Sequence, residues 1–156
     1  SAQQSISIWV NMDSYDASDY DEAVRLEGAN GYRISYYFGG NSWDTGFSNS
    51  ANTAATFLSI NKSYIPIGTW HNIVITHDGS ISRAYLDGNY MSQATLSSGS
   101  RNTSCGTNKL WMGAYGTTTV GGRYLDGKLD DFQLFNYALT AQQIKTLYNN
   151  GAASFR

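Results

Sequence analysis

Charge is scarce in this chain of 156 residues, where Asp, Glu, Lys and Arg together make up 14%, against about 25% in an average globular protein. The 10 Lys and Arg residues form no cluster along the sequence. Without a basic patch, neither nucleic acid nor an anionic membrane surface is expected as a partner. No apolar run approaches the roughly 20 residues of a spanning helix, so membrane insertion is not expected either.

Cysteine is almost absent. Cys105 stands alone, so no disulfide can form within the chain. Its side chain is either a small buried group or a bridge to another chain, and the sequence leaves both open. A chain of this length fits one domain over residues 1–156. Such a domain buries about 68–70% of its unfolded surface and needs no disulfide to be stable.

Small polar residues, glycine and aromatics take the place of the missing charge, with 16 Gly, 12 Tyr, 6 Phe and 4 Trp. Short strands joined by polar turns have this composition, which is typical of proteins that work outside the cell. The chain starts at Ser1 rather than Met, and any targeting signal is expected upstream. The composition therefore predicts an extracellular or surface-exposed location.

Strand patterns dominate. Residues 5–12 alternate strictly, with Ile6, Ile8, Val10 and Met12 on one face, and this period of two predicts a strand. Further strands are predicted at 22–27, 31–38, 56–61, 70–78, 82–86, 109–112 and 128–135. One helix is predicted after Thr140, because Gln143 completes a capping box and Gly151 suits a C-terminal cap.

The pattern predicts an all-β fold, a sandwich of two antiparallel sheets with one short C-terminal helix. Four segments in sequence order support a resemblance: ISIWV at 6–10, IGTWHNIVIT at 67–76, AYLDG at 84–88 and YLDGKLDDFQLFNYALT at 124–140. This order resembles the laminin-G-like, concanavalin A-like lectin/glucanase domains, which are jelly rolls. The resemblance runs from Ser5 to Gly151.

The resemblance implies an extra strand before the opening segment, where only four residues precede Ser5. That strand lies upstream, or a partner chain supplies it. An unpaired edge there would invite a neighbouring subunit to add a strand.

Catalysis is not expected. Glucanases with this fold place two glutamates and an aspartate along one strand, whereas this chain has only Glu22 and Glu27 as glutamates. Asp130 and Asp131 are adjacent on a predicted strand and should point to opposite faces, so they cannot form the carboxylate pair of a glycosidase. No catalytic residues are predicted.

Calcium is the one cofactor considered. Residues 13–22 hold five carboxylates, and Asp16, Asp19 and Asp21 are candidate ligands for a hard cation. A solvated acidic loop is the alternative. The resemblance adds Asp130 of the closing motif, as a calcium ligand or as a hydrogen-bond anchor at the sheet edge. Such an ion would stabilise the fold rather than react.

A sugar site needs aromatic rings that stack on the pyranose and polar groups that bind its hydroxyls. Two segments expected as loops, 37–44 and 115–124, offer both. Their candidates are Trp43, Asp44, Tyr115 and Arg123.

The predicted function is a carbohydrate-binding or adhesion module of a larger secreted or surface protein, with a glycan or glycoprotein as partner. The alternative is a structural or decoration subunit of a virion, filament or cell-surface layer that contacts neighbouring subunits through an open sheet edge. A glycan-active enzyme is the third hypothesis.

Overall fold

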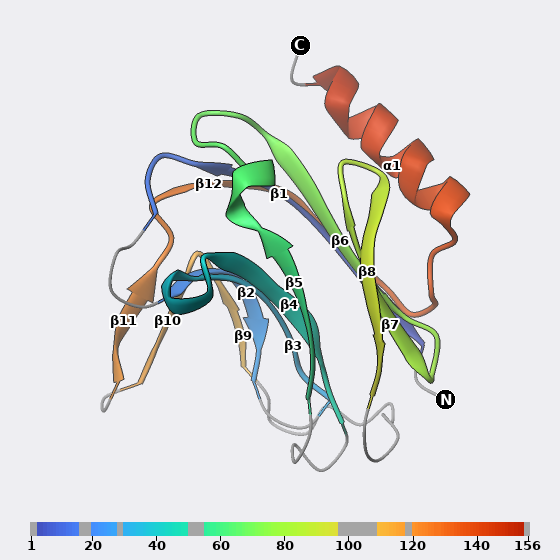
Figure 1. Cartoon of the computed structure of the whole chain (residues 1–156), viewed down its shortest axis with the longest axis horizontal. Helices are drawn as coiled ribbons and strands as arrows, with labels where there is room; N and C mark the ends of the chain where they lie inside the picture. The colour runs from blue at the N-terminus through green and yellow to red at the C-terminus, as the bar shows by residue number, and fades with distance from the viewer. Residues whose placement is uncertain are drawn as a thin grey trace.

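A computed structural model describes residues 3–15, 20–27, 30–49, 55–96, 109–117 and 120–154, and it shows two antiparallel sheets packed face to face (Figure 1). The first sheet has the order β12 (Gly127–Phe135), β1 (Gln4–Met12), β6 (His71–His77), β7 (Ile81–Leu86) and β8 (Asn89–Thr95). The second has the order β5 (Ala55–Asn61), β4 (Ser42–Ser48), β3 (Tyr32–Tyr37), β2 (Tyr20–Leu26) and β9 (Leu110–Met112). The predicted all-β sandwich is confirmed.

Four smaller elements complete the fold: the hairpin strands β10 (Ala114–Thr117) and β11 (Val120–Tyr124), and the short 3-10 helices η1 (Phe38–Gly40) and η2 (Lys62–Tyr64). The chain ends in helix α1 (Ala141–Ser154). Figure 1 shows α1 and the β10–β11 hairpin on opposite sides of the sandwich.

The core lies between the sheets and follows from the alternation of β1. Ile6, Ile8, Val10 and Met12 are all fully buried, because every second side chain of a strand points to the same face. They pack against side chains from the second sheet, among them Trp43. The intervening Trp9 is also buried, on the other face of β1, where it stacks on Tyr148 of α1 with ring centroids 5.6 Å apart.

Helix α1 covers the outer face of the first sheet. The predicted capping box is present, since the Thr140 N–H donates to the Gln143 side chain at 2.8 Å and the Gln143 N–H donates to Thr140 Oγ1 at 3.3 Å. Ile144 is fully buried in a cluster with Val74 and Tyr85. In the described part of the chain, no helix is long and apolar enough to cross a membrane.

Several predicted boundaries are wrong. The helix continues past Gly151 to Ser154, because glycine permits a helix end without imposing one. The segment 37–44 is not one loop but the end of β3, η1 and the start of β4, and 115–124 forms most of the β10–β11 hairpin. Strand β8 was not predicted at all.

The open edge expected beside the opening strand is not found among the described residues. Strand β1 pairs with β12 on one side and β6 on the other, so β12 and β8 form the edges of this sheet. The pairing with β12 carries a bulge at Asp131, whose φ is 46°. The strict alternation assumed for Asp130 and Asp131 therefore does not hold there.

Candidate functional site

The side of the second sheet that faces away from the core gathers polar and aromatic side chains. Strand β3 sends Ile34 and Tyr36 into the core, so Arg33, Ser35 and Tyr37 belong to the opposite side. Pairing extends this side across the sheet, because Ser35 lies opposite Asp44 on β4 and Asp44 lies opposite Ser59 on β5. We call this surface the open face and define it by Tyr20, Arg25, Arg33, Tyr37, Asp44, Phe57 and Ser59.

Two tyrosine rings stack on the open face. Tyr20 and Tyr37 lie opposite each other on β2 and β3, with ring centroids 4.7 Å apart and planes inclined by 20°. The Tyr37 ring also fills the space beside Gly39 and Gly40, where an added methyl group would contact it. The Tyr37 ring thus lies over these two glycines, and 37% of the residue remains exposed.

Three arginines lie against aromatic rings on or beside the open face. The Arg33 guanidinium is 4.9 Å from the Tyr20 centroid and 4.6 Å from the Phe57 centroid. Arg123, from the hairpin, lies 4.4 Å from the Tyr20 centroid, and Arg25 lies 4.1 Å from the centroid of Tyr115. These cation–π contacts tie the hairpin to the open face.

Asp44 forms the polar centre of the open face. Its Oδ2 lies 3.6 Å from Arg33 Nη2, and its Oδ1 accepts hydrogen bonds from Ser42 and Ser59 at 3.2 and 3.3 Å. Beside it is a cavity of about 490 Å³ lined by Tyr37, Gly40, Ser42, Asp44, Ser59 and Asn61. Small-molecule sites occupy roughly 300–1,000 Å³, so the cavity has room for a sugar ring.

Three of the four predicted sugar-binding residues are connected by a chain of contacts through Arg33 and Tyr20. Asp44 contacts Arg33, which shares the Tyr20 ring with Arg123, and Arg123 also lies 5.8 Å from the Tyr115 centroid. Tyr115 meets Trp111 of β9 edge to face, with centroids 5.7 Å apart.

Trp43 is the exception, because it is fully buried on the core side of β4. Its indole N–H donates to the Tyr15 hydroxyl at 3.3 Å. The prediction of an exposed ring was wrong because Trp43 and Asp44 are neighbours within a strand, and only one of them can face solvent.

Tyr20, Arg33 and Phe57 were missed. The signal for Arg33 was present, since the alternation of residues 32–37 already separates Arg33, Ser35 and Tyr37 from the apolar side chains. Tyr20 and Phe57 belong to the site because the register of β2 with β3 and of β4 with β5 places them there. Local sequence does not determine this register.

A sequence model of the concanavalin A-like lectin/glucanase superfamily matches residues 1–145. The chain belongs to this superfamily. A comparison with curated protein sequences finds no match.

Solved structures share the fold at low identity. The binding domain of botulinum neurotoxin serotype G has a TM-score of 0.73 and 18% identity, with 98% of this chain and 37% of that chain covered. A candidate carbohydrate-binding protein from Bacteroides ovatus has a TM-score of 0.69 and 15% identity over 92% and 40% of the two chains. A mutant Trypanosoma rangeli sialidase has a TM-score of 0.65 and 15% identity over 97% and 23%. This chain thus spans well under half of each.

Because the superfamily includes glucanases, the spacing of Glu22 and Asp44 is compared with that of a catalytic carboxylate pair. Glu22 and Asp44 both lie opposite Ser35, on either side of β3, so two strand spacings of about 4.8 Å separate their backbones. An inverting glycosidase holds its carboxyl groups about 6.5–9.5 Å apart. Glu22 is fully buried, and its Oε2 lies 3.9 Å from Arg25 Nη1.

The candidate calcium ligands are not brought together in the described part of the superfamily domain. Asp21 is 1% exposed on the core side of β2, whereas Asp130 is exposed on β12 and its Oδ1 accepts the Asp131 N–H at 2.7 Å. Asp16 and Asp19 lie outside the described residues, as does Cys105. Among the residues that the structure describes, no three His, Cys, Asp or Glu side chains gather as a metal site. Calcium binding stays a prediction.

Proposed function

We propose that this chain is a non-catalytic carbohydrate-binding module and that its ligand lies along the open face. The observation that carries the proposal is the pairing of the exposed Tyr37 ring with Asp44 and its serines around one cavity of about 490 Å³. The apolar face of a sugar stacks on an aromatic ring while carboxylate and hydroxyl groups bind its hydroxyls. The fold supports the proposal, since binding domains share it.

The proposed setting is a larger secreted or surface protein that this module attaches to a glycan or glycoprotein. Such sites are shallow and bind through few contacts, so single substitutions should have large effects on affinity.

Titration calorimetry with a polysaccharide and oligosaccharide panel tests the proposal. Tyr37→Ala and Asp44→Ala should each weaken binding of the selected glycan at least tenfold. Tyr90→Ala is the matched control, because Tyr90 is 53% exposed on β8 of the first sheet, away from the open face. An absence of binding at millimolar glycan, with calcium present, would contradict the proposal, as would equal effects of Tyr37→Ala and Tyr90→Ala.

A structural or decoration subunit is the second candidate, favoured by the edge strand β12. This strand lies at the edge of the first sheet, has nine residues and carries Leu134, which is 53% exposed. An exposed strand edge can pair with a strand of another chain. Light scattering over a concentration series separates the two functions. A monomer at every concentration that binds glycan leaves this candidate without support.

An enzyme is the third candidate, and Glu22 and Asp44 on one sheet face favour it. Hydrolysis of a glycan panel by the wild-type chain and by Asp44→Asn tests it. Turnover that Asp44→Asn abolishes would replace the binding module with a glycosidase.

A further inference from the structure

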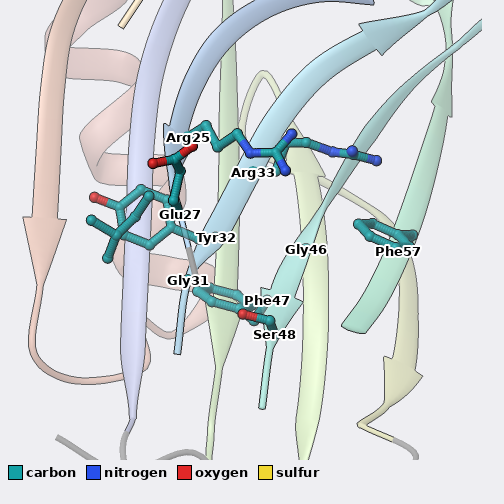
Figure 2. A pocket seen from close by; sticks show the side chains of 10 residues that line it. Arg25, Glu27, Gly31, Tyr32, Arg33, Gly46, Phe47, Ser48 and Phe57 are labelled. Carbon is teal, nitrogen blue, oxygen red and sulfur yellow. The ribbon is translucent and has the colours of Figure 1, made fainter. Parts of the chain in front are cut away.

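A second, smaller cavity of about 90 Å³ lies on the same open face. Its lining includes Arg25 from β2, Arg33 from β3 and Phe57 from β5 (Figure 2). In Figure 2 both arginine side chains extend across the strands toward the side on which Phe57 lies. Two guanidinium groups and an exposed ring thus border one small space.

Gly46 makes this arrangement possible. It lies in β4 between Arg33 and Phe57, opposite each in register. A methyl group at position 46 would collide with the carbonyl oxygen of Thr56, so the position stays without a side chain. The Arg33 guanidinium can therefore cross β4 and reach the Phe57 ring at 4.6 Å.

The two arginines still have donors to offer. Arg33 Nε and Arg25 Nη1 are buried and have no hydrogen-bond acceptor in the described part of the chain. Their carboxylate neighbours lie at ion-pair rather than hydrogen-bond distance, since Arg33 Nη2 is 3.6 Å from Asp44 and Arg25 Nη1 is 3.9 Å from Glu22, whereas a charge-assisted hydrogen bond measures about 2.7–2.9 Å. Buried donors without an acceptor cost free energy, and a turn of either guanidinium toward the cavity would let a bound oxyanion accept from it and remove that cost.

We infer that the cavity between Arg25 and Arg33 binds an oxyanion substituent of the glycan, a carboxylate or a sulfate ester. The inference rests on the proposed function, because it places the acidic group on a sugar that lies along the open face. Guanidinium forks match planar and tetrahedral oxyanions through paired hydrogen bonds. Phe57, 53% exposed, gives the ring that carries the substituent an apolar surface.

The lining of the cavity carries more positive than negative charge, although Glu22 and Asp44, outside the lining, offset part of it at 3.9 and 3.6 Å from the two arginines. Arg25 and Arg33 contribute two positive charges to the lining, and Glu27 contributes one negative charge. The acidic ligand should therefore bind against partial repulsion from Glu27, and Glu27→Gln should strengthen its binding. This gain is a prediction independent of the arginine variants.

The experiment compares acidic glycans with their neutral counterparts. Uronate oligosaccharides are measured before and after carboxyl reduction, and sulfated oligosaccharides before and after desulfation, by calorimetry at fixed ionic strength. The wild-type chain should bind one acidic form at least tenfold tighter than its neutral counterpart. The pair that shows the difference identifies the substituent.

Variants then locate the effect. Arg25→Gln and Arg33→Gln should each bring the ratio of acidic to neutral affinity close to one, and Glu27→Gln should raise the ratio about threefold. Arg83→Gln is the control, since Arg83 pairs with Asp78 at 2.6 Å on the first sheet, and it should leave the ratio unchanged. Arg33→Lys keeps the charge, so it distinguishes lost charge from lost fold if the Gln variant unfolds.

The outcomes separate this inference from the proposed function. Equal affinity for acidic and neutral forms overturns the inference and leaves the binding module standing, as does a ratio that Arg25→Gln and Arg33→Gln do not change. No affinity for any glycan overturns both.

Discussion

Trp43 and Asp44 are neighbours in β4 with opposite surroundings. The indole of Trp43 is buried beside Tyr15 and Tyr36, whereas the carboxylate of Asp44 reaches solvent and two serine hydroxyls. The first side chain holds the sheets together and the second belongs to the binding surface.

Trp43→Phe should therefore lower the free energy of unfolding without changing glycan affinity. The smaller ring leaves a void and removes the hydrogen bond to Tyr15, at a cost of about 1–3 kcal/mol. Urea denaturation measures the loss, and calorimetry with the selected glycan measures affinity. Asp44→Asn should show the reverse pattern, and a tenfold loss of affinity in Trp43→Phe would contradict the division of roles.

The partly buried Tyr15 hydroxyl should make the free energy of unfolding depend on pH in the alkaline range. Burial raises the pKa of the Tyr15 hydroxyl to about 12, although the hydrogen bond from Trp43 acts in the opposite direction. The unfolded chain ionises its tyrosines near pH 10 and so loses the Tyr15 proton first. The free energy of unfolding should fall as pH rises from 10 to 12.

Thermal melting of the wild type and Tyr15→Phe across this range checks the sign. Between pH 10 and 12, the melting temperature of the wild type should fall more steeply with pH than that of Tyr15→Phe. Tyr64→Phe serves as control, since Tyr64 is 58% exposed, and it should follow the wild type. Parallel curves for all three proteins would show that Tyr15 is not the group responsible.

Among the elements, helix α1 depends on a side chain that precedes it. Thr140→Ala removes the hydroxyl that accepts the Gln143 N–H, and the loss of such a cap costs about 1 kcal/mol. Chemical denaturation should show this decrease. Thr146→Ala, inside the same helix, should change stability little, because Thr146 is exposed and alanine is a better helix former. A similar loss in both variants would mean that the cap is not the cause.

The sequence predicts those elements whose local pattern is strong. Strand β1 alternates without interruption, and Thr140 and Gln143 define the start of the helix, so both were predicted within a residue or two. Strand β4 reads SWDTGFS, in which glycine and small polar residues hide the alternation, and its position follows from pairing with β3 and β5 instead. For the same reason the sequence predicts a loop where the hairpin β10–β11 forms.

Single residues of the candidate site were predictable from their type, but the contacts between them were not. Asp44, Tyr115 and Arg123 were identified from residue type, but their connection runs through Tyr20 and Arg33 on other strands. Register between strands far apart in sequence decides such contacts, and a single sequence contains little information on it.

Over the whole molecule, the two sheets share one hydrophobic core, to which β1, β3, β4 and β6 all contribute. The single domain predicted for residues 1–156 should therefore unfold in one cooperative step. Scanning calorimetry should give equal calorimetric and van't Hoff enthalpies. Two resolved transitions would instead indicate that one sheet, or the helix, unfolds separately.

The edge-to-face contact between Trp111 and Tyr115 gives the protein an optical reporter of its own. Trp9 and Trp43 are buried, so a bound molecule cannot reach their indoles, and the half-buried Trp70 directly precedes β6 of the first sheet. Trp111 is half-buried at the margin of the open face, beside the ring that Arg25 covers. A saccharide that settles there would alter the emission of this indole, and the intrinsic fluorescence of the unlabelled chain would then follow occupancy directly.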